Sequence, residues 1–251
     1  MLKQIIRSIS SRIRSEEDVD DSTRTIWKIK IDGMEMSIVD HKGSQTPKAI
    51  FRELIRDELG LLDFRAPPMP VIIDIGANTG IISILMGKRF PNATIYAFEP
   101  LPRNFENLKL NLEKNQVQNV KAFNLALTSD GRELEMTAVL ADNSGGSTAN
   151  AKEAIRRAPR GNIYQARSIT LDSVFHENGI SSCDLLKIDC EGSEHEILGT
   201  FSQMSKIGHL IGEIHFNRTI LEQGHDRRSI DAVLRQLGND RYRVKYINMC
   251  E

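Results

Sequence analysis

VIIDIGANTG, residues 71–80, is the stretch that decides which fold this sequence predicts. The run Val71–Ile75 is mostly β-branched and apolar, which is typical of a strand buried in a parallel sheet. Gly76 and Gly80 then permit a tight turn close to a bound molecule. Strand, glycine loop and helix in this order form the opening unit of a nucleotide-binding α/β fold. The helix is indicated by apolar residues at helical spacing, Ile82, Leu85, Met86 and Phe90.

The composition agrees with a single α/β domain. A chain of 251 residues can bury one large core. Its 33 Lys and Arg residues nearly balance its 34 Asp and Glu residues, so no strong net field favours a nucleic-acid partner. The 3 cysteines lack metal-ligand spacing, which argues against a disulfide framework or a structural zinc site and favours a reducing, cytoplasmic location. No apolar run approaches the roughly 20 residues needed to cross a bilayer.

Residues 1–66 are predicted to form an N-terminal cap on a core domain that spans 67–251. The basic stretch 1–15 is predicted as a surface helix or a frayed end, with contact to a membrane surface or a partner as the alternative. Asp32-Gly33 joins two strand-like runs, which is a strong signal for a β-hairpin. A helix is expected over Thr46–Leu59, followed by a stiff proline-rich linker into the core strand.

The remaining core elements alternate between strands and helices. This alternation predicts a doubly wound, mostly parallel sheet with helices on both faces, in which the last strand could form an antiparallel edge pair. Residues 130–168 break the pattern and are predicted to form an insertion above the carboxyl edge of the sheet. The expected strands are 93–98, 120–127, 184–189, 209–216 and 241–249, and the expected helices are 102–115, 170–177, 193–201 and 229–237.

The predicted insertion contains a loop rich in serine and glycine at 141–150, where a substrate loop or lid is expected. A basic stretch follows this loop. Its positive charge could attract an acidic substrate or a peptide leader, although a solvated basic face is the simpler interpretation. The arginines concerned are Arg156, Arg157, Arg160 and Arg167.

The glycine loop differs from the dinucleotide fingerprint, because its spacing is D-x-G-x-x-x-G rather than G-x-G-x-x-G. A gentler loop of this kind suits a ligand that carries no phosphate next to it. Asp74 could supply a negative charge for a cationic or zwitterionic tail. Glu99 follows the next predicted strand, and a carboxylate there can accept two hydrogen bonds from a ribose diol.

Four segments in this order and spacing are similar to the FkbM-type S-adenosylmethionine-dependent methyltransferases. The similarity runs from about Val71 to His215. It implies a Rossmann-like, class I methyltransferase sheet of seven strands, with S-adenosylmethionine as the cofactor. Acceptors across the family include sugar hydroxyls, carbamoyl groups and peptide side-chain amides. The segments are VIIDIGANTG (71–80), AFEP (97–100), NLAL (124–127) and LLKIDCEGSEHEIL (185–198).

The resemblance also implies which residues contact each part of the cofactor. The methionine moiety would lie on the glycine loop, the ribose at the end of the second core strand, and the adenine at the end of the third. The methyl group would lie beside 189–192, and the family's polar loop corresponds to Asn143–Ser147. The implied binding residues are Asp74, Gly76, Ala77, Asn78, Gly80, Glu99, Pro100, Asn124, Ala126 and Asp189.

Three polar residues gather where the strand 184–189 meets its turn. Buried charges are costly unless they are paired, so Lys187, Asp189 and Glu191 require an explanation. They could line the site of the sulfonium and the acceptor. Alternatively, Asp189 caps the next helix while Lys187 pairs with a neighbouring carboxylate. The helical residues 194–196, Glu-His-Glu, are predicted to form a solvated face.

Glu213 and His215 alternate along one strand and therefore point to the same side of the sheet. They could hold or deprotonate an acceptor, or they could form a structural hydrogen bond. His41, in a polar turn, is predicted to lie at the surface. A hydroxyl or amide acceptor needs a general base, and the candidates are Glu191, Glu213 and His215.

The sequence thus predicts an S-adenosylmethionine-dependent methyltransferase that acts on an oxygen or amide nitrogen of a natural-product, sugar or peptide acceptor. In-line displacement with general-base help would carry the transfer. No metal-ligand cluster is visible in the sequence, so metal-free transfer is expected. The alternatives are a nicotinamide-dependent oxidoreductase and a catalytically silent binding module. The oligomeric state is open, with a homodimer as one option.

Overall fold

The computed structural model describes residues 12–17, 22–138, 162–238 and 240–248. The central sheet contains β4 (Val71–Ile75), β5 (Thr94–Phe98), β6 (Val120–Phe123), β11 (Cys183–Ile188), β12 (Ile207–Phe216) and β13 (Tyr242–Asn248). The helices are α2 (Thr46–Arg56), α3 (Ile81–Arg89), α4 (Pro102–Lys114), α6 (Leu171–Glu177), α7 (Glu194–Thr200), α8 (Arg218–Glu222) and α9 (Arg227–Leu234). The smaller sheets contain β1 (Arg12–Glu17), β2 (Arg24–Ile31), β3 (Met34–His41), β7 (Ala126–Leu127), β8 (Leu134–Ala138), β9 (Asn162–Ala166) and β10 (Ser168–Ile169). Short 3-10 turns lie at Leu61–Asp63, Met204–Lys206 and Arg235–Leu237.

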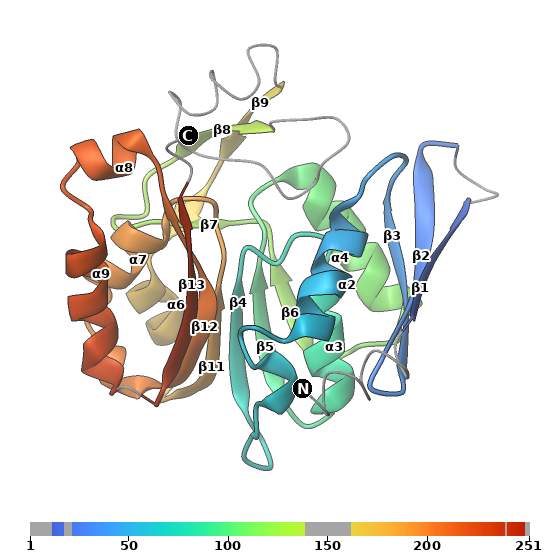
Figure 1. The fold of residues 1–251 in the computed structure, drawn as a ribbon, viewed down its shortest axis with the longest axis horizontal. Coiled ribbons are helices and arrows are strands. Elements are labelled where there is room, and N and C mark those ends of the chain that lie inside the picture. Colours follow the sequence, from blue (N-terminus) through green and yellow to red (C-terminus); the bar gives the residue numbers. More distant parts are fainter. Residues whose placement is uncertain (1–11, 18–21, 139–161, 239, 249–251) are drawn as a thin grey trace.

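The central sheet is wound on both faces, as the sequence predicted. Its strand order is β13-β12-β11-β4-β5-β6, and each neighbouring pair is parallel. Figure 1 shows α6, α7 and α9 on one side of this sheet and α3 and α4 on the other. The chain starts in the middle with β4, builds outward to β6, and then returns to β11 on the other side of β4. Such a reversal leaves a crevice at the carboxyl ends of the two central strands, which is where open α/β sheets bind ligands.

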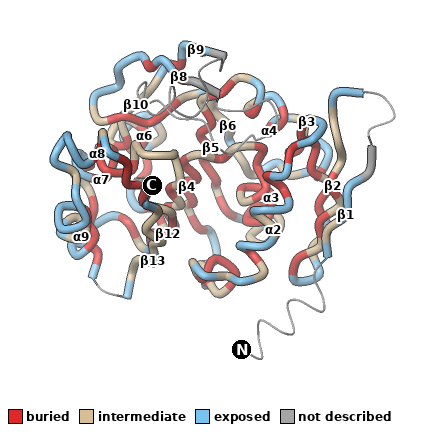
Figure 2. The backbone as a smooth tube through the Cα atoms, turned by 45° about the horizontal axis from the view of Figure 1, so that its top comes forward, coloured by how far each residue is buried: buried red, intermediate tan, exposed pale blue. Residues whose placement is uncertain are grey.

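Alternation along the strands supplies the two hydrophobic cores. Ile72 and Ile95 pack with the residues of α3 and α4, whereas Ile73 and Tyr96 pack with those of α6 and α7. Because successive side chains in a strand point to opposite faces, a continuous apolar run such as β4 serves both cores at once. β4, β5, β11 and β12 are accordingly buried along most of their length, whereas the edge strands β6 and β13 are only partly buried (Figure 2).

The N-terminal cap is a three-stranded antiparallel sheet followed by α2. β2 and β3 form the hairpin that Asp32-Gly33 predicted, and both turn residues have positive φ, 48° and 82°. β1 pairs with β2 over residues 12–17, so the predicted helix is wrong for that part of 1–15. The rest of the basic stretch lies outside the described residues. Antiparallel pairing with β2 explains the difference, because alternation over six residues is a short signal that a helical pattern can mimic.

Two asparagines of α4 join the cap to the core. Asn111 accepts from the backbone N–H of Val39 at 2.7 Å and donates to its carbonyl at 2.9 Å. Asn115 makes the same exchange with Ser37, at 2.9 and 2.7 Å. Trp27, Ile29 and other cap residues also belong to the same hydrophobic cluster as α3. The cap therefore shares a core with the sheet domain rather than having one of its own.

Several element boundaries and one strand direction differ from the sequence predictions. The sheet has six strands among the described residues instead of seven, and β13 is parallel to β12 rather than antiparallel. The connection through α8 and α9 is long enough to carry the chain back for a parallel crossover. The sequence analysis did not predict α8. The helix α2 ends at Arg56 because Asp57 adopts a left-handed conformation, with φ 47°.

The predicted insertion contains one antiparallel pair, β8 with β9. Its serine- and glycine-rich loop, including Asn143–Ser147, lies outside the described residues, as do Arg156, Arg157 and Arg160. Arg167 is exposed next to β10. Within the described part of the chain, no helix is both long enough and apolar enough to cross a membrane.

Two glycines make a matched test of this packing. A Cβ at Gly212 would lie 1.9 Å from the carbonyl oxygen of Ile188 on the neighbouring strand, whereas a Cβ at Gly199 in α7 would meet nothing within 4 Å. We expect Gly212→Ala to destabilise the protein by about 2 kcal/mol or more, lowering the Tm by roughly 4–8 °C. Gly199→Ala should raise the Tm slightly, because alanine is the better helix former. Thermal unfolding of both variants checks this, and an unchanged Tm for Gly212→Ala would contradict the described strand contact.

Candidate functional site

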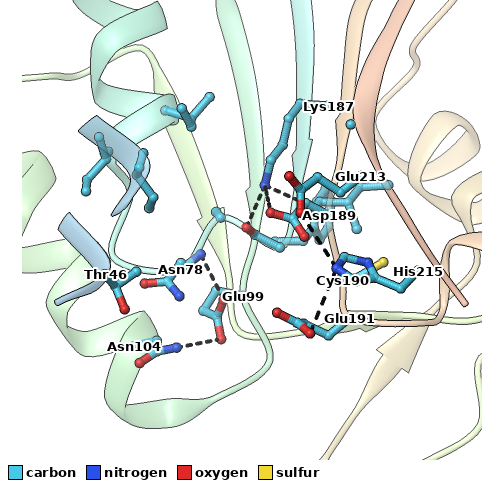
Figure 3. Close-up of a pocket in the computed structure, with 18 of the residues that line it drawn as sticks. Thr46, Asn78, Glu99, Asn104, Lys187, Asp189, Cys190, Glu191, Glu213 and His215 are labelled. Atoms are coloured by element: carbon cyan, nitrogen blue, oxygen red, sulfur yellow. Dashed lines mark hydrogen bonds and ion pairs between the residues drawn. The ribbon is translucent and has the colours of Figure 1, made fainter. Parts of the chain in front are cut away.

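A cavity of about 770 Å³ opens at the carboxyl ends of the central strands, a size typical of cofactor sites. Figure 3 shows acidic side chains from the ends of β5, β11 and β12 and amide side chains from the glycine loop and α4 converging on it, with α2 of the cap at one side. Of the predicted site residues, Gly76, Ala77, Asn78, Glu99, Pro100, Ala126, Asp189, Glu191, Glu213 and His215 line the cavity. Asp74, Gly80 and Asn124 lie behind the lining and support it.

The glycine loop passes very close to the end of β11. Gly76 has φ 76°, and a Cβ on it would lie 1.8 Å from the carbonyl oxygen of Asp189. The backbone N–H groups of Gly76 and Ala77 both donate to the carbonyl of Phe98, at 3.0 and 2.9 Å. Gly80 is needed for packing instead, since a Cβ there would lie 2.3 Å from Leu108. Gly76 therefore lets the loop, β5 and β11 approach one another around the cavity.

Glu99 presents its carboxylate to the cavity at the end of β5. One oxygen accepts from the backbone N–H of Asn78 at 2.8 Å, and the other accepts from the N–H of Leu101 at 2.9 Å. Burial raises the pKa of Glu99 to about 7, against the opposing effect of these hydrogen bonds. Asn124 donates to the backbone carbonyls of Glu99 and Pro100, each at 2.9 Å. Asn124 thus holds the end of β5 in place instead of lining the cavity.

Beneath the glycine loop, Asp74 and Lys187 form a buried ion pair. Lys187 Nζ lies 3.3 Å from Asp74 Oδ1, and Asp74 is only 1% exposed. Asp74 also accepts from the hydroxyl of Ser83 at 2.6 Å. Lys187 donates to the carbonyl of Gly76 at 2.8 Å. Burial favours the neutral amine of Lys187, but the nearby carboxylates Asp74 and Asp189 outweigh it and raise the pKa.

Four further polar groups lie together where β11 and β12 end. The Nε2 atom of His215 is 3.9 Å from a carboxylate oxygen of Glu191 and 3.7 Å from one of Glu213. Asp189 completes the group, and withdrawal from solvent raises the pKa of its carboxyl. Glu213 is also paired with Lys245 of β13 at 2.9 Å. Glu191 has φ 56°, a conformation that non-glycine residues seldom adopt.

The predicted solvated face at 194–196 is wrong for its first two residues. Glu194 is fully buried, and its carboxylate accepts from the backbone N–H groups of Cys190 and Gly192 and pairs with His215 Nδ1 at 3.0 Å. His195 is 4% exposed, and its Nε2 lies 2.9 Å from the carbonyl oxygen of His215. Glu196 is less buried and pairs with Arg132 at 2.8 Å.

The Glu194–His215 contact changes the electrostatics of both groups. Burial alone would raise the pKa of Glu194, but the hydrogen bond from His215 and the two turn N–H groups lower it. Burial alone would lower the pKa of His215, but its hydrogen bond to Glu194 and the neighbouring carboxylates raise it to about 9. Asp189 does not cap α7, whose N-cap residue is Ser193 without a side-chain capping bond, but the other half of that alternative, the pairing of Lys187 with a neighbouring carboxylate, is confirmed by Asp74.

Other residues of the site were not predicted, and His41 was predicted wrongly. His41 is 3% exposed, and its Nδ1 lies 2.8 Å from Asp40. Thr46 of α2 and Lys245 of β13 line the cavity. A carboxylate in the first turn after Cys-Glu-Gly could have indicated Glu194, since such groups often bind the N–H groups of a helix start. No local signal places α2 or β13 at the site.

The protein-family model described as "Methyltransferase FkbM domain" matches residues 74–244 of this sequence. This chain belongs to that family. Methyltransferase sdnD of Sordaria araneosa is 31% identical over 157 residues, covering 53% of this chain and 60% of that protein. The 31-O-demethyl-FK506 methyltransferase FkbM of Streptomyces tacrolimicus is 26% identical over 205 residues, covering 70% of this chain and 78% of that protein.

A further relative is much longer than this chain. The AMB antimetabolite synthetase AmbE of Pseudomonas aeruginosa is 28% identical over 202 residues, and the match covers 67% of this chain but only 10% of AmbE. Among solved structures, a precorrin-6y C5,15-methyltransferase from Geobacter metallireducens GS-15 matches with a TM-score of 0.35 and 17% identity, covering 64% of this chain and 58% of the other.

The buried carboxyl of Glu99 predicts a pH dependence. Its pKa in the folded protein, about 7, lies above the ordinary 4.5, so the folded state holds this proton more tightly than the unfolded chain does. The associated stability is present below pH 4.5 and is lost as the pH rises to about 7. We expect Glu99→Gln to lose less stability than the wild type between about pH 5 and about pH 8, by up to about 3 kcal/mol.

Thermal unfolding across this pH range measures the effect. The informative quantity is the difference between wild type and Glu99→Gln, because the altered hydrogen bonding of glutamine adds a constant offset. Glu106→Gln on the exposed side of α4 is the control and should follow the wild type. A wild-type minus variant difference that stays constant with pH would show that Glu99 does not titrate in this window.

Proposed function

We propose that this chain is an S-adenosylmethionine-dependent methyltransferase that acts on an oxygen or an amide nitrogen of a small-molecule or peptide acceptor. The observation that supports it most is the position of Glu99. In a chain of this family, its carboxylate lies at the end of β5, beside a glycine loop that joins β4 to α3. A carboxylate at this place can accept hydrogen bonds from both hydroxyls of a ribose.

The residues that line the cavity fit this cofactor. Gly76 leaves free the space that a Cβ would fill, so the loop can approach the methionine part closely. Glu99 keeps acceptor capacity at Oε2, which accepts one hydrogen bond, from Asn78, whereas Oε1 accepts from Leu101 and, at 3.5 Å, from Asn104. Phe98 and Leu101 add apolar surface to the cavity, which suits the adenine ring of the cofactor. Asp189 and Glu191 supply negative charge that suits a sulfonium.

When bound, S-adenosylmethionine supplies a methyl group that the positive sulfur already activates. The task of the protein is then to orient the acceptor, to exclude water and to remove a proton. Thr46 of α2 and Lys245 of β13 also line the cavity and could position the acceptor. Of the three candidate bases, the carboxylates of Glu191 and Glu213 can accept the proton directly, whereas His215, with its pKa raised to about 9, must first release its own.

Two relatives bear on the type of acceptor. One carries a name that specifies an oxygen, the 31-O-demethyl-FK506 methyltransferase. Another is a large synthetase of an antimetabolite. Both names support a natural-product acceptor with a hydroxyl as the first class to test, followed by carbamoyl and peptide amides.

A binding titration tests the cofactor. We expect purified wild type to bind S-adenosylmethionine and S-adenosylhomocysteine with micromolar Kd by calorimetry. Glu99→Ala should weaken both by roughly 10- to 100-fold, because a charged hydrogen bond of this kind contributes about 1.5–3 kcal/mol. Glu106→Ala on α4, which is exposed, is the matched control and should bind like the wild type.

Each outcome of this titration has a defined meaning. No binding to the folded wild type would contradict the proposal, and the nicotinamide cofactors would then be titrated in the same way. Binding that is retained in Glu99→Ala would contradict the ribose role of Glu99. Wild-type binding without methyl transfer to any hydroxyl, carbamoyl or amide acceptor would favour a silent binding module over an enzyme.

A further inference from the structure

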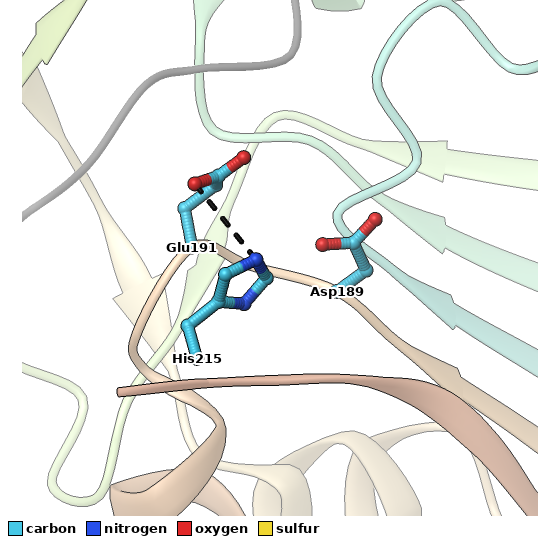
Figure 4. A group of neighbouring side chains, drawn as sticks. All are labelled: Asp189, Glu191 and His215. Atoms are coloured by element: carbon cyan, nitrogen blue, oxygen red, sulfur yellow. Dashed lines mark ion pairs between the residues drawn. The ribbon is translucent and has the colours of Figure 1, made fainter. Parts of the chain in front are cut away.

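Three different side chains that can bind a metal ion meet at the edge of the cavity. One ligand atom from each of Asp189, Glu191 and His215 lies within 4.8 Å of the other two. Figure 4 shows both carboxylates and the imidazole ring turned toward a common space above the ends of β11 and β12. Ligand atoms around one ion lie a few ångströms apart, so small side-chain rotations would bring these three into one coordination sphere.

The orientation of His215 is the second observation that points to a cation. Its Nδ1 atom is held by the buried carboxylate of Glu194 at 3.0 Å, which leaves Nε2 directed at the cavity. Glu194 is itself fixed by the N–H groups of Cys190 and Gly192. A ring nitrogen that pairs with a carboxylate while the other faces ligands is the usual arrangement of metal-binding histidines, because it sets the tautomer and the angle of the ring.

The two lysines nearest the trio each have a closer partner outside it. Lys245 forms an ion pair with Glu213 at 2.9 Å, and Glu213 is not one of the three residues. Lys187 approaches Asp189 only to 4.0 Å, and it lies closer to Asp74 and to the carbonyl of Gly76. The trio combines two carboxylates with one imidazole, and a divalent ion bound among them would compensate the charge of both carboxylates.

We propose that Asp189, Glu191 and His215 form a binding site for a divalent transition-metal ion such as Mn²⁺. One imidazole nitrogen with two carboxylate oxygens is a mixed donor set that suits Mn²⁺ better than the all-oxygen coordination preferred by Mg²⁺. Three protein ligands leave coordination positions open toward the cavity. This site was not expected from the sequence, because His215 is distant from the other two ligands and reaches them only through the pairing of β11 with β12.

The open positions suggest a role that rests on the proposed function. An acceptor with a hydroxyl, or with two adjacent oxygen atoms, could occupy them and be held beside the methyl donor. A metal-bound hydroxyl is also more acidic, so its proton could pass to Glu213, which lies 3.7 Å from His215 Nε2. Methyl transfer to that oxygen would then leave a neutral thioether on the donor and an ether on the acceptor.

Electron paramagnetic resonance with MnCl₂ tests the site, since the signal of free Mn²⁺ is lost on binding. We expect the metal-stripped wild type to bind about one Mn²⁺ per chain, and we expect Glu191→Gln and Asp189→Asn each to weaken binding at least about tenfold. Glu222→Gln on α8 is the control, since its side chain is 56% exposed and pairs with Arg218. Circular dichroism confirms that each variant is folded.

The outcomes separate this site from the proposed function. If the folded wild type does not bind Mn²⁺, or if Glu191→Gln and Asp189→Asn both bind like the wild type, the metal site is wrong. S-adenosylmethionine is titrated separately in the presence of a chelator, so cofactor binding without metal binding would leave the proposed function intact. Water-proton relaxation by bound Mn²⁺ should reveal at least one exchangeable water, and its absence would overturn the open positions.

Discussion

The ion pair between Asp74 and Lys187 is the interaction on which the centre of the structure depends. It joins β4 to β11, the two strands between which the direction of winding reverses. Removing two charges from water costs several kcal/mol per ion unless further hydrogen bonds satisfy them. Ser83 does so for Asp74, and the carbonyl of Gly76 does so for Lys187. The same contacts that satisfy the buried charges therefore set the shape of the glycine loop above them.

Glu194 likewise links neighbouring strand ends through a buried charge. It binds the N–H groups of the turn after β11 and the ring of His215 on β12. Two adjacent strand ends are thus fixed relative to each other by a single buried carboxylate. Lys187 and Glu194 have opposite charges but act alike, because each satisfies backbone groups that a tight turn leaves without partners. The polar residues that line the cavity are consequently supported by Asp74 and Glu194, which do not line it.

The sequence predicted the parts of the structure that depend on local patterns. Apolar strands, the hairpin at Asp32-Gly33 and the start of the helix after Thr170 follow from the residues themselves. Glu194 was misjudged because a Glu-His-Glu run at the start of a helix looks exposed, and its burial arises from packing against β12. The direction of β13 was missed for a related reason, since alternation marks an edge strand without specifying which way it runs.

The same contrast between local motifs and tertiary packing applies to the lining of the cavity. The side that suits the cofactor comes from consecutive motifs at the ends of β4, β5 and β11, whose order along the chain reveals them. The remaining lining comes from α2, β12 and β13, which reach the cavity only through tertiary packing. Because α2 and β13 lie far from the glycine loop in the sequence, substitutions there can reshape the lining while leaving the residues of the loop unchanged. Acceptor specificity should therefore depend more on residues 46–58 and β13 than on the motifs that define the family.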